Sequence, residues 1–204
     1  MIRSRVLATA LLLASGVAAC NSTDVTDPAP GGEYGDELAA VIAAAEATVT
    51  ADSPDRRPRH PVFDELAAEI PGFGGFYRAA RCVVVVVLTD EGDPELAVRV
   101  VSAALEPMAR RACPDGLTVQ TAPGQFTYIQ LQRILAATQD LLSIRGVVGM
   151  KLDFKINKVV ILVASRDTVD EVLAALPRVG VPEEAVAFRP GSGDGRRDRA
   201  GSRG

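Results

Sequence analysis

The chain has 204 residues and a formal net charge of −4, from 22 basic and 26 acidic side chains. This acidic balance argues against nucleic acid as a partner, because phosphate binding needs concentrated Lys and Arg. Aromatic residues make up 4% of the chain and Trp is absent, so large stacking platforms for bases or sugars are not expected.

Residues 1–19 have the layout of a secretory signal peptide. A short basic start precedes an apolar stretch from Val6 to Val17, and small residues then lead into Cys20. The apolar stretch is too short to span a bilayer core of about 30 Å comfortably. The ending Val17-Ala18-Ala19-Cys20 resembles a bacterial lipobox. The resemblance implies cleavage before Cys20, lipid on its thiol and membrane attachment; an ordinary signal peptide or a short membrane helix is the alternative.

Residues 20–61 are predicted to form a tether that contains one short helix. Asn21 to Gly32 is polar and rich in Pro and Gly, and a helix is expected from Asp36 to Val49. In bacteria with two membranes, an acidic residue directly after the lipidated cysteine favours retention of a lipoprotein in the inner membrane. This chain has Asn21 at that position instead. The expected location is therefore the cell envelope outside the cytoplasm, at the outer membrane or cell surface rather than the inner membrane. Residues 191–204 lack apolar side chains and are predicted to be a disordered tail.

Residues 62–190 are predicted to form a folded domain of the α+β class. Two valine-rich strands are apolar on both faces, so both should be central and covered. The elements expected first are a helix Phe63–Ile70, strands Phe73–Arg78 and Cys82–Thr89, a helix opened by Asp93 that buries Leu96, Val100, Val101, Ala104 and Met108, and a strand Leu117–Thr121. A helix opened by a Thr127–Gln130 capping box follows, and then a strand with Val148, Met150, Leu152 and Phe154 inward and a turn at Asn157. The last expected elements are a strand Val159–Ala164, a helix opened by a second capping box at Thr168–Glu171, and a strand Ala185–Phe188.

The domain is predicted to be a duplication. Ile70-Pro71-Gly72 is followed by a hairpin, an apolar strand, a helix and a strand, and the same order follows Ile144-Arg145-Gly146. Each half is then a β-β-α-β unit with a small mixed sheet covered by helices, and the helix after Thr127 joins the two. Convergent amphipathic patterns are the alternative explanation.

The second half carries a family resemblance. Thr127-Tyr128 opens a helix, and Gly149, Asp153 and Asn157 keep the spacing of a Gly-x-x-x-Asp-x-x-x-Asn-Arg-Val hairpin, with Lys158 at the Arg position. This run is similar to the pro-domains of secreted trypsin-like serine proteases of the alpha-lytic protease and streptogrisin kind. The resemblance covers residues 127–188 well and 70–121 as a weaker duplicate, without the protease.

In that family the module is a small α+β unit that binds its protease and guides its folding. The resemblance therefore implies protein binding centred on the hairpin residues. Because Val159 to Leu162 is too apolar to be exposed, the edge of the hairpin is expected to make the contact, by strand addition. The predicted partner-binding residues are Lys151, Asp153, Lys155, Asn157 and Lys158.

No catalytic or metal-binding arrangement is evident, so the chain is not expected to be an enzyme. A serine-protease triad needs a histidine, and the one histidine, His60, lies in a linker rich in Arg and Pro. Nucleophile-elbow and P-loop spacings are absent, and Glu183-Glu184 is explained as a turn. No cofactor, metal or small-molecule substrate is expected.

Cys82 and Cys113 are predicted to form a structural disulfide. Export favours a disulfide, and the two cysteines lack the Cys-x-x-Cys spacing of redox sites. About seven strand residues cover ~23 Å and about sixteen helical residues cover ~24 Å. The end of the helix near Cys113 should therefore lie beside the start of the strand at Cys82.

These observations predict a membrane-anchored, non-enzymatic protein-binding module. The partner class implied by the resemblance is an exported serine protease, for which the chain would be a chaperone or inhibitor. The alternative is a structural or adhesive lipoprotein of the cell envelope with no protease partner, whose exposed edges serve assembly.

Overall fold

The computed structural model describes residues 36–50, 60–110 and 112–191. The predicted signal peptide, the lipidation site Cys20 and the predicted tail from residue 192 onward lie outside these residues. No helix in the described part is both long and apolar enough to cross a membrane.

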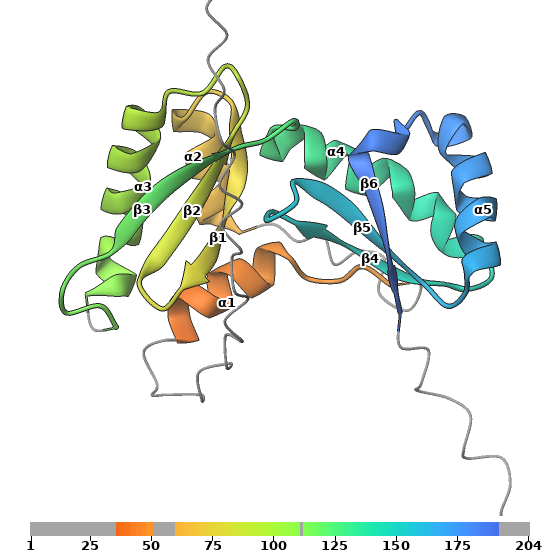
Figure 1. Cartoon of the computed structure of the whole chain (residues 1–204), viewed down its shortest axis with the longest axis horizontal. Coiled ribbons are helices and arrows are strands. Elements are labelled where there is room, and N and C mark those ends of the chain that lie inside the picture. Colours follow the sequence, from red (N-terminus) through yellow and green to blue (C-terminus); the bar gives the residue numbers. More distant parts are fainter. Residues whose placement is uncertain (1–35, 51–59, 111, 192–204) are drawn as a thin grey trace, which may run out of the picture. The chain divides into compact units, whose positions relative to one another are not determined.

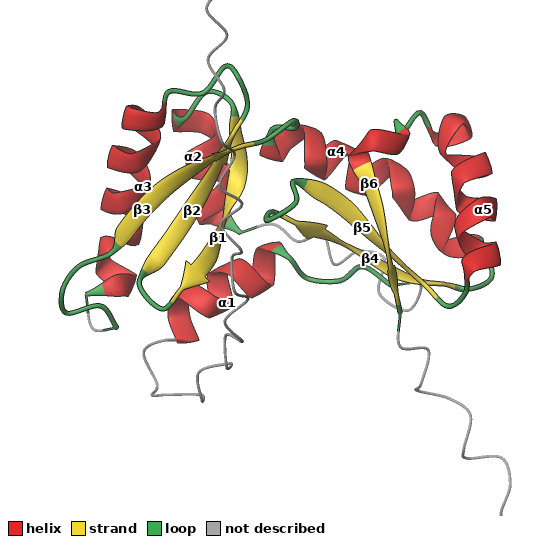
Figure 2. Ribbon diagram, viewed as in Figure 1, coloured by secondary structure: helices red, strands yellow, loops and turns green. Residues whose placement is uncertain are grey.

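Two small mixed sheets form the fold and confirm the predicted α+β class (Figures 1 and 2). In each sheet the first two strands are antiparallel, and the third pairs parallel with the second after a helical crossover. The valine-rich strands are central, as predicted. The first sheet and its crossover are β1 (Phe73–Ala80), β2 (Val83–Leu88), α3 (Pro94–Ala109) and β3 (Thr118–Pro123); the second are β4 (Val147–Asp153), β5 (Lys158–Val163), α5 (Arg166–Ala175) and β6 (Val186–Pro190).

The two halves repeat each other in individual backbone contacts. Both first strands carry a β-bulge, which follows Phe73 in one half and Val147 in the other. Hydrogen bonds at the C-terminal ends of the two central strands also match, and an amphipathic pattern alone does not produce such matches. The equivalent pairs are Thr89 N–H to Gly72 O and Ala164 N–H to Gly146 O, then Gly124 N–H to Leu88 O and Gly191 N–H to Val163 O.

The repeat is longer than predicted, because each half also begins with a helix. α2 (Pro61–Glu69) precedes β1, and α4 (Tyr128–Thr138) with the 3₁₀ turn Gln139–Ser143 precedes β4. Each leads into an Ile-x-Gly turn whose glycine has a positive φ, 70° at Gly72 and 94° at Gly146. The unit is therefore α-β-β-α-β. The predicted capping box at Thr127 is present.

Two local predictions were wrong. The buried face of α3 is Ala97, Val101, Leu105 and Ala109, whereas the predicted Ala104 is exposed and Leu96, Val100 and Met108 are half-buried. The helix α5 is capped by Ser165, whose Oγ accepts the Thr168 N–H at 3.3 Å. Thr168 is thus inside the helix and does not cap it. After α5 the chain continues through 3₁₀ turns at Leu176–Val179 and Glu183–Ala185.

Residues 36–50, predicted to belong to the tether, pack against the domain. α1 (Asp36–Ala45) ends earlier than predicted, contacts α3 and β1, and buries Val41 and Ile42. Val49 then forms a bridge with Met150 of β4, with backbone hydrogen bonds of 2.7 and 2.8 Å in the two directions. The folded part therefore begins well before residue 62.

The predicted disulfide between Cys82 and Cys113 is present, with 5.7 Å between the two Cα atoms. It joins the start of β2 to the segment after α3, because helix and strand have matched lengths. Closing a loop with a sequence separation of 31 stabilises the fold by about 3–4 kcal/mol in the chain-entropy model.

Candidate functional site

The two halves meet at a cluster of five buried aromatic rings. Phe63 of α2 is at the centre, with ring centroids 4.4 Å from Phe76, 5.0 Å from Phe154, 5.5 Å from Tyr128 and 6.1 Å from Phe73. Phe154 comes from the turn between β4 and β5, so the cluster attaches the hairpin of the second half to the first half.

Gly75 permits this close approach. Its φ is 111°, and a Cβ atom there would overlap the Phe154 ring. Both conditions exclude ordinary side chains, so β1 meets the turn with its bare backbone.

Asn157 fixes the same turn by polar contacts. Its φ of 52° confirms the predicted left-handed turn residue. The carboxamide Oδ1 accepts the N–H groups of Gln125 at 2.8 Å and Phe126 at 2.7 Å, and Nδ2 donates to Phe126 O at 2.9 Å and Gly74 O at 3.4 Å. Asn157 is only 5% exposed. Its polar atoms are therefore used inside the protein, which leaves them no evident role in binding a partner.

Asp153 also supports the turn. Its Oδ1 accepts the N–H groups of Lys155 at 3.1 Å and Ile156 at 3.4 Å, and its Oδ2 pairs with Arg189 of β6 at 2.9 Å. Asp153 is 8% exposed. This predicted binding residue thus orders the hairpin from within.

Lys151 is half-buried beside Glu46, in the segment between α1 and Val49. Burial raises the pKa of Glu46, while Lys151 and a hydrogen bond from the Phe154 N–H lower it and Asp153 raises it further. The backbone N–H and C=O groups of Met150, at the edge of β4, already bond to Val49. Strand addition at that edge, the predicted mode of contact, therefore lacks free backbone at its centre.

The exposed part of the hairpin is its tip. Lys155 and Ile156 point to solvent, Ile156 being 39% exposed, and Lys158 is half-buried. Ile129 of α4 is 42% exposed, and these two isoleucines are the exposed large hydrophobic residues of the described chain. Ile129 lies three residues after Phe126, and Ile156 directly precedes Asn157, so both flank the Asn157–Phe126 contact.

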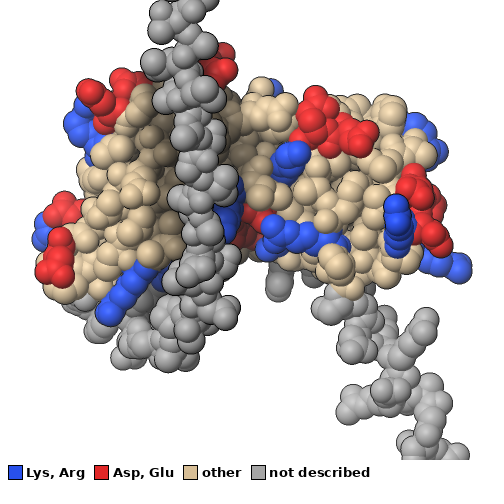
Figure 3. Space-filling model, viewed as in Figure 1, with Lys and Arg blue, Asp and Glu red and all other residues tan. Residues whose placement is uncertain are grey.

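We call Phe126, Ile129, Arg133, Lys155 and Ile156 the seam surface. Phe126 is half-buried and Arg133 is exposed one turn after Ile129. The ion pairs in the described part of the chain, Arg110–Glu106 and Arg189–Asp153, leave both of its cations unpaired. Figure 3 shows that charges of both signs are interspersed on the visible face.

Sequence reasoning selected polar residues of the hairpin, of which only Lys155 belongs to the seam surface. It missed Arg133 and the three hydrophobic residues. The signal in the sequence that could have identified Ile129 was the helical spacing of the apolar residues of α4. Its buried stripe is Tyr128, Leu131 and Leu135, and Ile129 falls outside it. An isoleucine out of phase with a helix's buried face indicates an exposed apolar position.

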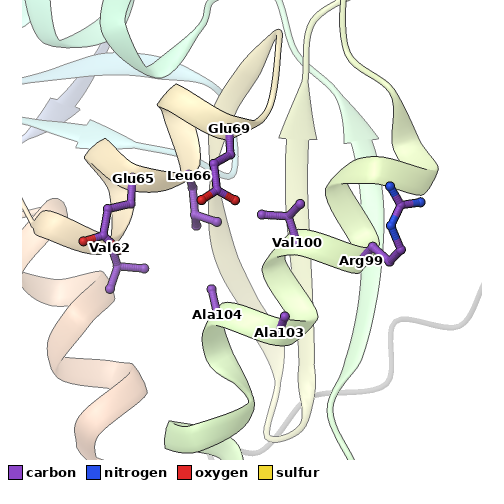
Figure 4. A pocket seen from close by; sticks show the side chains of 8 residues that line it. All are labelled: Val62, Glu65, Leu66, Glu69, Arg99, Val100, Ala103 and Ala104. Carbon is purple, nitrogen blue, oxygen red and sulfur yellow. The ribbon is translucent and has the colours of Figure 1, made fainter.

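A shallow pocket of about 490 Å³ lies between α2 and α3 (Figure 4). Its lining is mainly apolar, with carboxylates from α2 on one side and a guanidinium from α3 on the other. The described residues that line it include no Ser, Cys or His. Its lining residues are Val62, Glu65, Leu66, Glu69, Arg99, Val100, Ala103 and Ala104.

The structure gives His60 a structural role. Its Nδ1 accepts the N–H of Val62 at 3.3 Å and caps α2. Within residues 36–50, 60–110 and 112–191, no group of three or more His, Cys, Asp and Glu side chains is placed to hold a metal ion.

Comparison with protein-family models, with curated proteins and with solved structures finds no match to this chain.

Asn157→Gly should lower the free energy of unfolding by about 2–6 kcal/mol, from four lost hydrogen bonds at about 0.5–1.5 kcal/mol each. Glycine keeps the positive φ, so the change isolates the carboxamide. Urea unfolding measures the loss. The exposed Gln125→Ala, which leaves its backbone contact intact, is the control. A loss for Asn157→Gly no larger than for this control would contradict the assigned role.

Glu46→Gln should make the protein more stable than the wild type at neutral pH. A raised pKa means that the folded state disfavours the charged Glu46 carboxylate and favours the neutral acid. The neutral acid stabilises the fold below the ordinary pKa of 4.5, and this contribution is lost as the pH rises through the pKa of the folded state. The advantage of Gln should therefore grow from pH 4 to pH 8 in urea titrations. The exposed Glu65→Gln is the matched control, and an advantage independent of pH would contradict the prediction.

Proposed function

We propose that the chain is a membrane-anchored, non-enzymatic module that binds an exported protein through the seam surface. The supporting observation is that the exposed isoleucines flank a rigid polar contact. The Asn157 carboxamide and the Phe63 cluster fix the hairpin tip against the start of α4. Such a preorganised surface binds without first ordering its own backbone.

The partner class is an exported trypsin-like serine protease, for which the module acts as chaperone or inhibitor. The resemblance of residues 127–188 to protease pro-domains motivates this choice. The seam surface suits a partner with an apolar side chain flanked by carboxylates, because it combines isoleucines with Arg133 and Lys155.

Anchoring through lipid on Cys20 is the second part of the proposal. A single acyl chain holds a protein only marginally, so stable attachment needs more than one. Cys20→Ser should move the protein from the membrane to the soluble fraction of its own host, and should remove the lipid mass from the N-terminal peptide. A wild-type protein that is already soluble and without lipid would overturn this part.

The binding test uses secreted trypsin-like proteases from the same organism. Binding, protease activity and protease refolding are measured with the wild type and with the pairs Ile129→Ser/Ile156→Ser and Arg133→Glu/Lys155→Glu. Each pair should weaken binding about tenfold or more, since truncated anchor residues each cost on the order of 1–2 kcal/mol or more. Thermal melting verifies that the variants fold.

Arg166→Glu/Arg178→Glu is the matched control. Both arginines are exposed, and they belong to α5 and to the turn that follows it, not to the seam surface. If the wild type neither binds nor alters any protease, the protease proposal fails. If it binds and the seam pairs behave like the control, the partner class stands and the seam surface is wrong.

The alternative function, a structural or adhesive envelope lipoprotein, has one observation in its favour. β3 is exposed or half-buried along its length, and its outer edge has no strand beside it in the described structure. Such an edge suits assembly more directly than it suits protease binding.

A further inference from the structure

The backbone of β3 presents unpaired hydrogen-bonding groups at the border of the first sheet. Thr118 N–H donates to Cys82 O at 2.9 Å and Gly124 N–H donates to Leu88 O at 2.7 Å, so the even-numbered residues face β2. In an extended strand alternate residues bond to opposite sides. Val119 and Thr121 therefore direct their N–H and C=O groups away from β2, where no described strand lies (Figure 2).

The other sheet borders are protected. Val49 pairs with Met150 on β4, and β1 packs against α1 and α4. β6 carries Arg189, which is paired with Asp153, and ends in a proline. Natural sheets protect their edges by charge, proline, bulges or cover.

β3 has only Pro123, at its very end, and residues 116–132 include no charged side chain. The strand is otherwise exposed or half-buried throughout. An uncharged edge with no described strand beside it is suited to pairing with another strand.

We infer that β3 pairs antiparallel with β3 of a second copy, joining two three-stranded sheets into one of six strands. The outward backbone groups of β3 are complementary to the same groups of a second β3 placed antiparallel to it. Within β3, Val119 and Thr121 are the residues with both an outward N–H and an outward C=O, and pairing each with the other in the second copy places a two-fold axis at Gln120. No like charges then face each other across the junction, as the pairing requires.

Pro123 fits this register. It lies opposite Leu117 of the second copy, at the end of the ladder, where a missing N–H costs one terminal hydrogen bond. A strand from an unrelated protein would satisfy the same backbone groups, and the experiment separates it from a second copy. Closed two-fold pairing is also the commonest form of self-association.

The register is tested by cross-linking in the full chain carrying Cys20→Ser, which removes the third cysteine of the sequence and leaves the Cys82–Cys113 bridge. Residues that face each other at a non-hydrogen-bonded antiparallel position have Cα atoms about 4.5 Å apart, within the range of a disulfide. Gln120→Cys should therefore form a covalent dimer under mild oxidation. Thr118→Cys alone should stay uncross-linked, but mixed with Ala122→Cys it should form a heterodimer.

Sedimentation of the same Cys20→Ser chain, with its native β3, should show a concentration-dependent dimer. Thr121→Pro removes one outward N–H while leaving the bonds to β2, and should shift the protein to monomer at concentrations where the parent is dimeric. Thr121→Val is the control and should remain dimeric. A parent that is monomeric at all concentrations overturns the inference and leaves the edge to another protein. Self-cross-linking by Thr118→Cys in place of Gln120→Cys overturns the register and with it the proposed interface.

Discussion

The carboxamide of Asn157 is the interaction on which the junction of the two halves depends. It places one oxygen between two N–H groups and one nitrogen between two carbonyls, all of them backbone groups of Gly74, Gln125 and Phe126. Three of these hydrogen bonds are partly buried and the one to Gly74 is buried, and a buried group left without a partner costs more than its hydrogen bond contributes. The left-handed turn, the bare backbone of Gly75 and the inward Phe154 all serve to bring this side chain to its partners.

Duplication produced two halves with the same backbone path but different stabilising contacts. The first half closes its crossover covalently, by the disulfide between Cys82 and Cys113. The second half has no cysteine; it is held by the Asp153–Arg189 ion pair across its sheet and by Val49, which forms a bridge with Met150 of β4. The second half is therefore stabilised in part by residues that precede the first half in the chain. Such crossing of contacts makes the two repeats one folding unit.

The sequence predicts the features that are encoded locally. Valine runs indicated the central strands, Thr127 and Gln130 indicated the start of α4, and matched lengths of strand and helix indicated the disulfide. The wrong predictions arose where two local patterns compete. Ser165 and Thr168 both suit a helix start, and the end of β5 at Val163 selects the earlier one. In α3, alanines at 97 and 109 face the sheet because a close approach favours small residues, whereas the larger Leu96 and Val100 suggested a different face.

The candidate site was predictable only in part, because its decisive contacts are long-range. Nothing near Asn157 in the sequence indicates that its partners lie 31 residues earlier, at Phe126, and 83 residues earlier, at Gly74. The hairpin was located correctly, but the polar residues assigned to binding included two, Asp153 and Asn157, that the fold uses internally. A polar residue with a turn motif carries the same local signal in either role, and only burial distinguishes them.

One uncharged segment, residues 116–132, contributes both the open edge of β3 and Ile129 of the seam surface. The Asn157 contact at Phe126 lies between them, so the same side chain fixes the end of β3 and the start of α4. An edge with only two fully outward residues offers few hydrogen bonds, and pairing through it is weak in dilute solution. Attachment to a membrane would raise the effective concentration of copies without adding any contact. The proposed anchor at Cys20 and the inferred β3 pairing are thus physically linked, because the first supplies the concentration that a short edge requires.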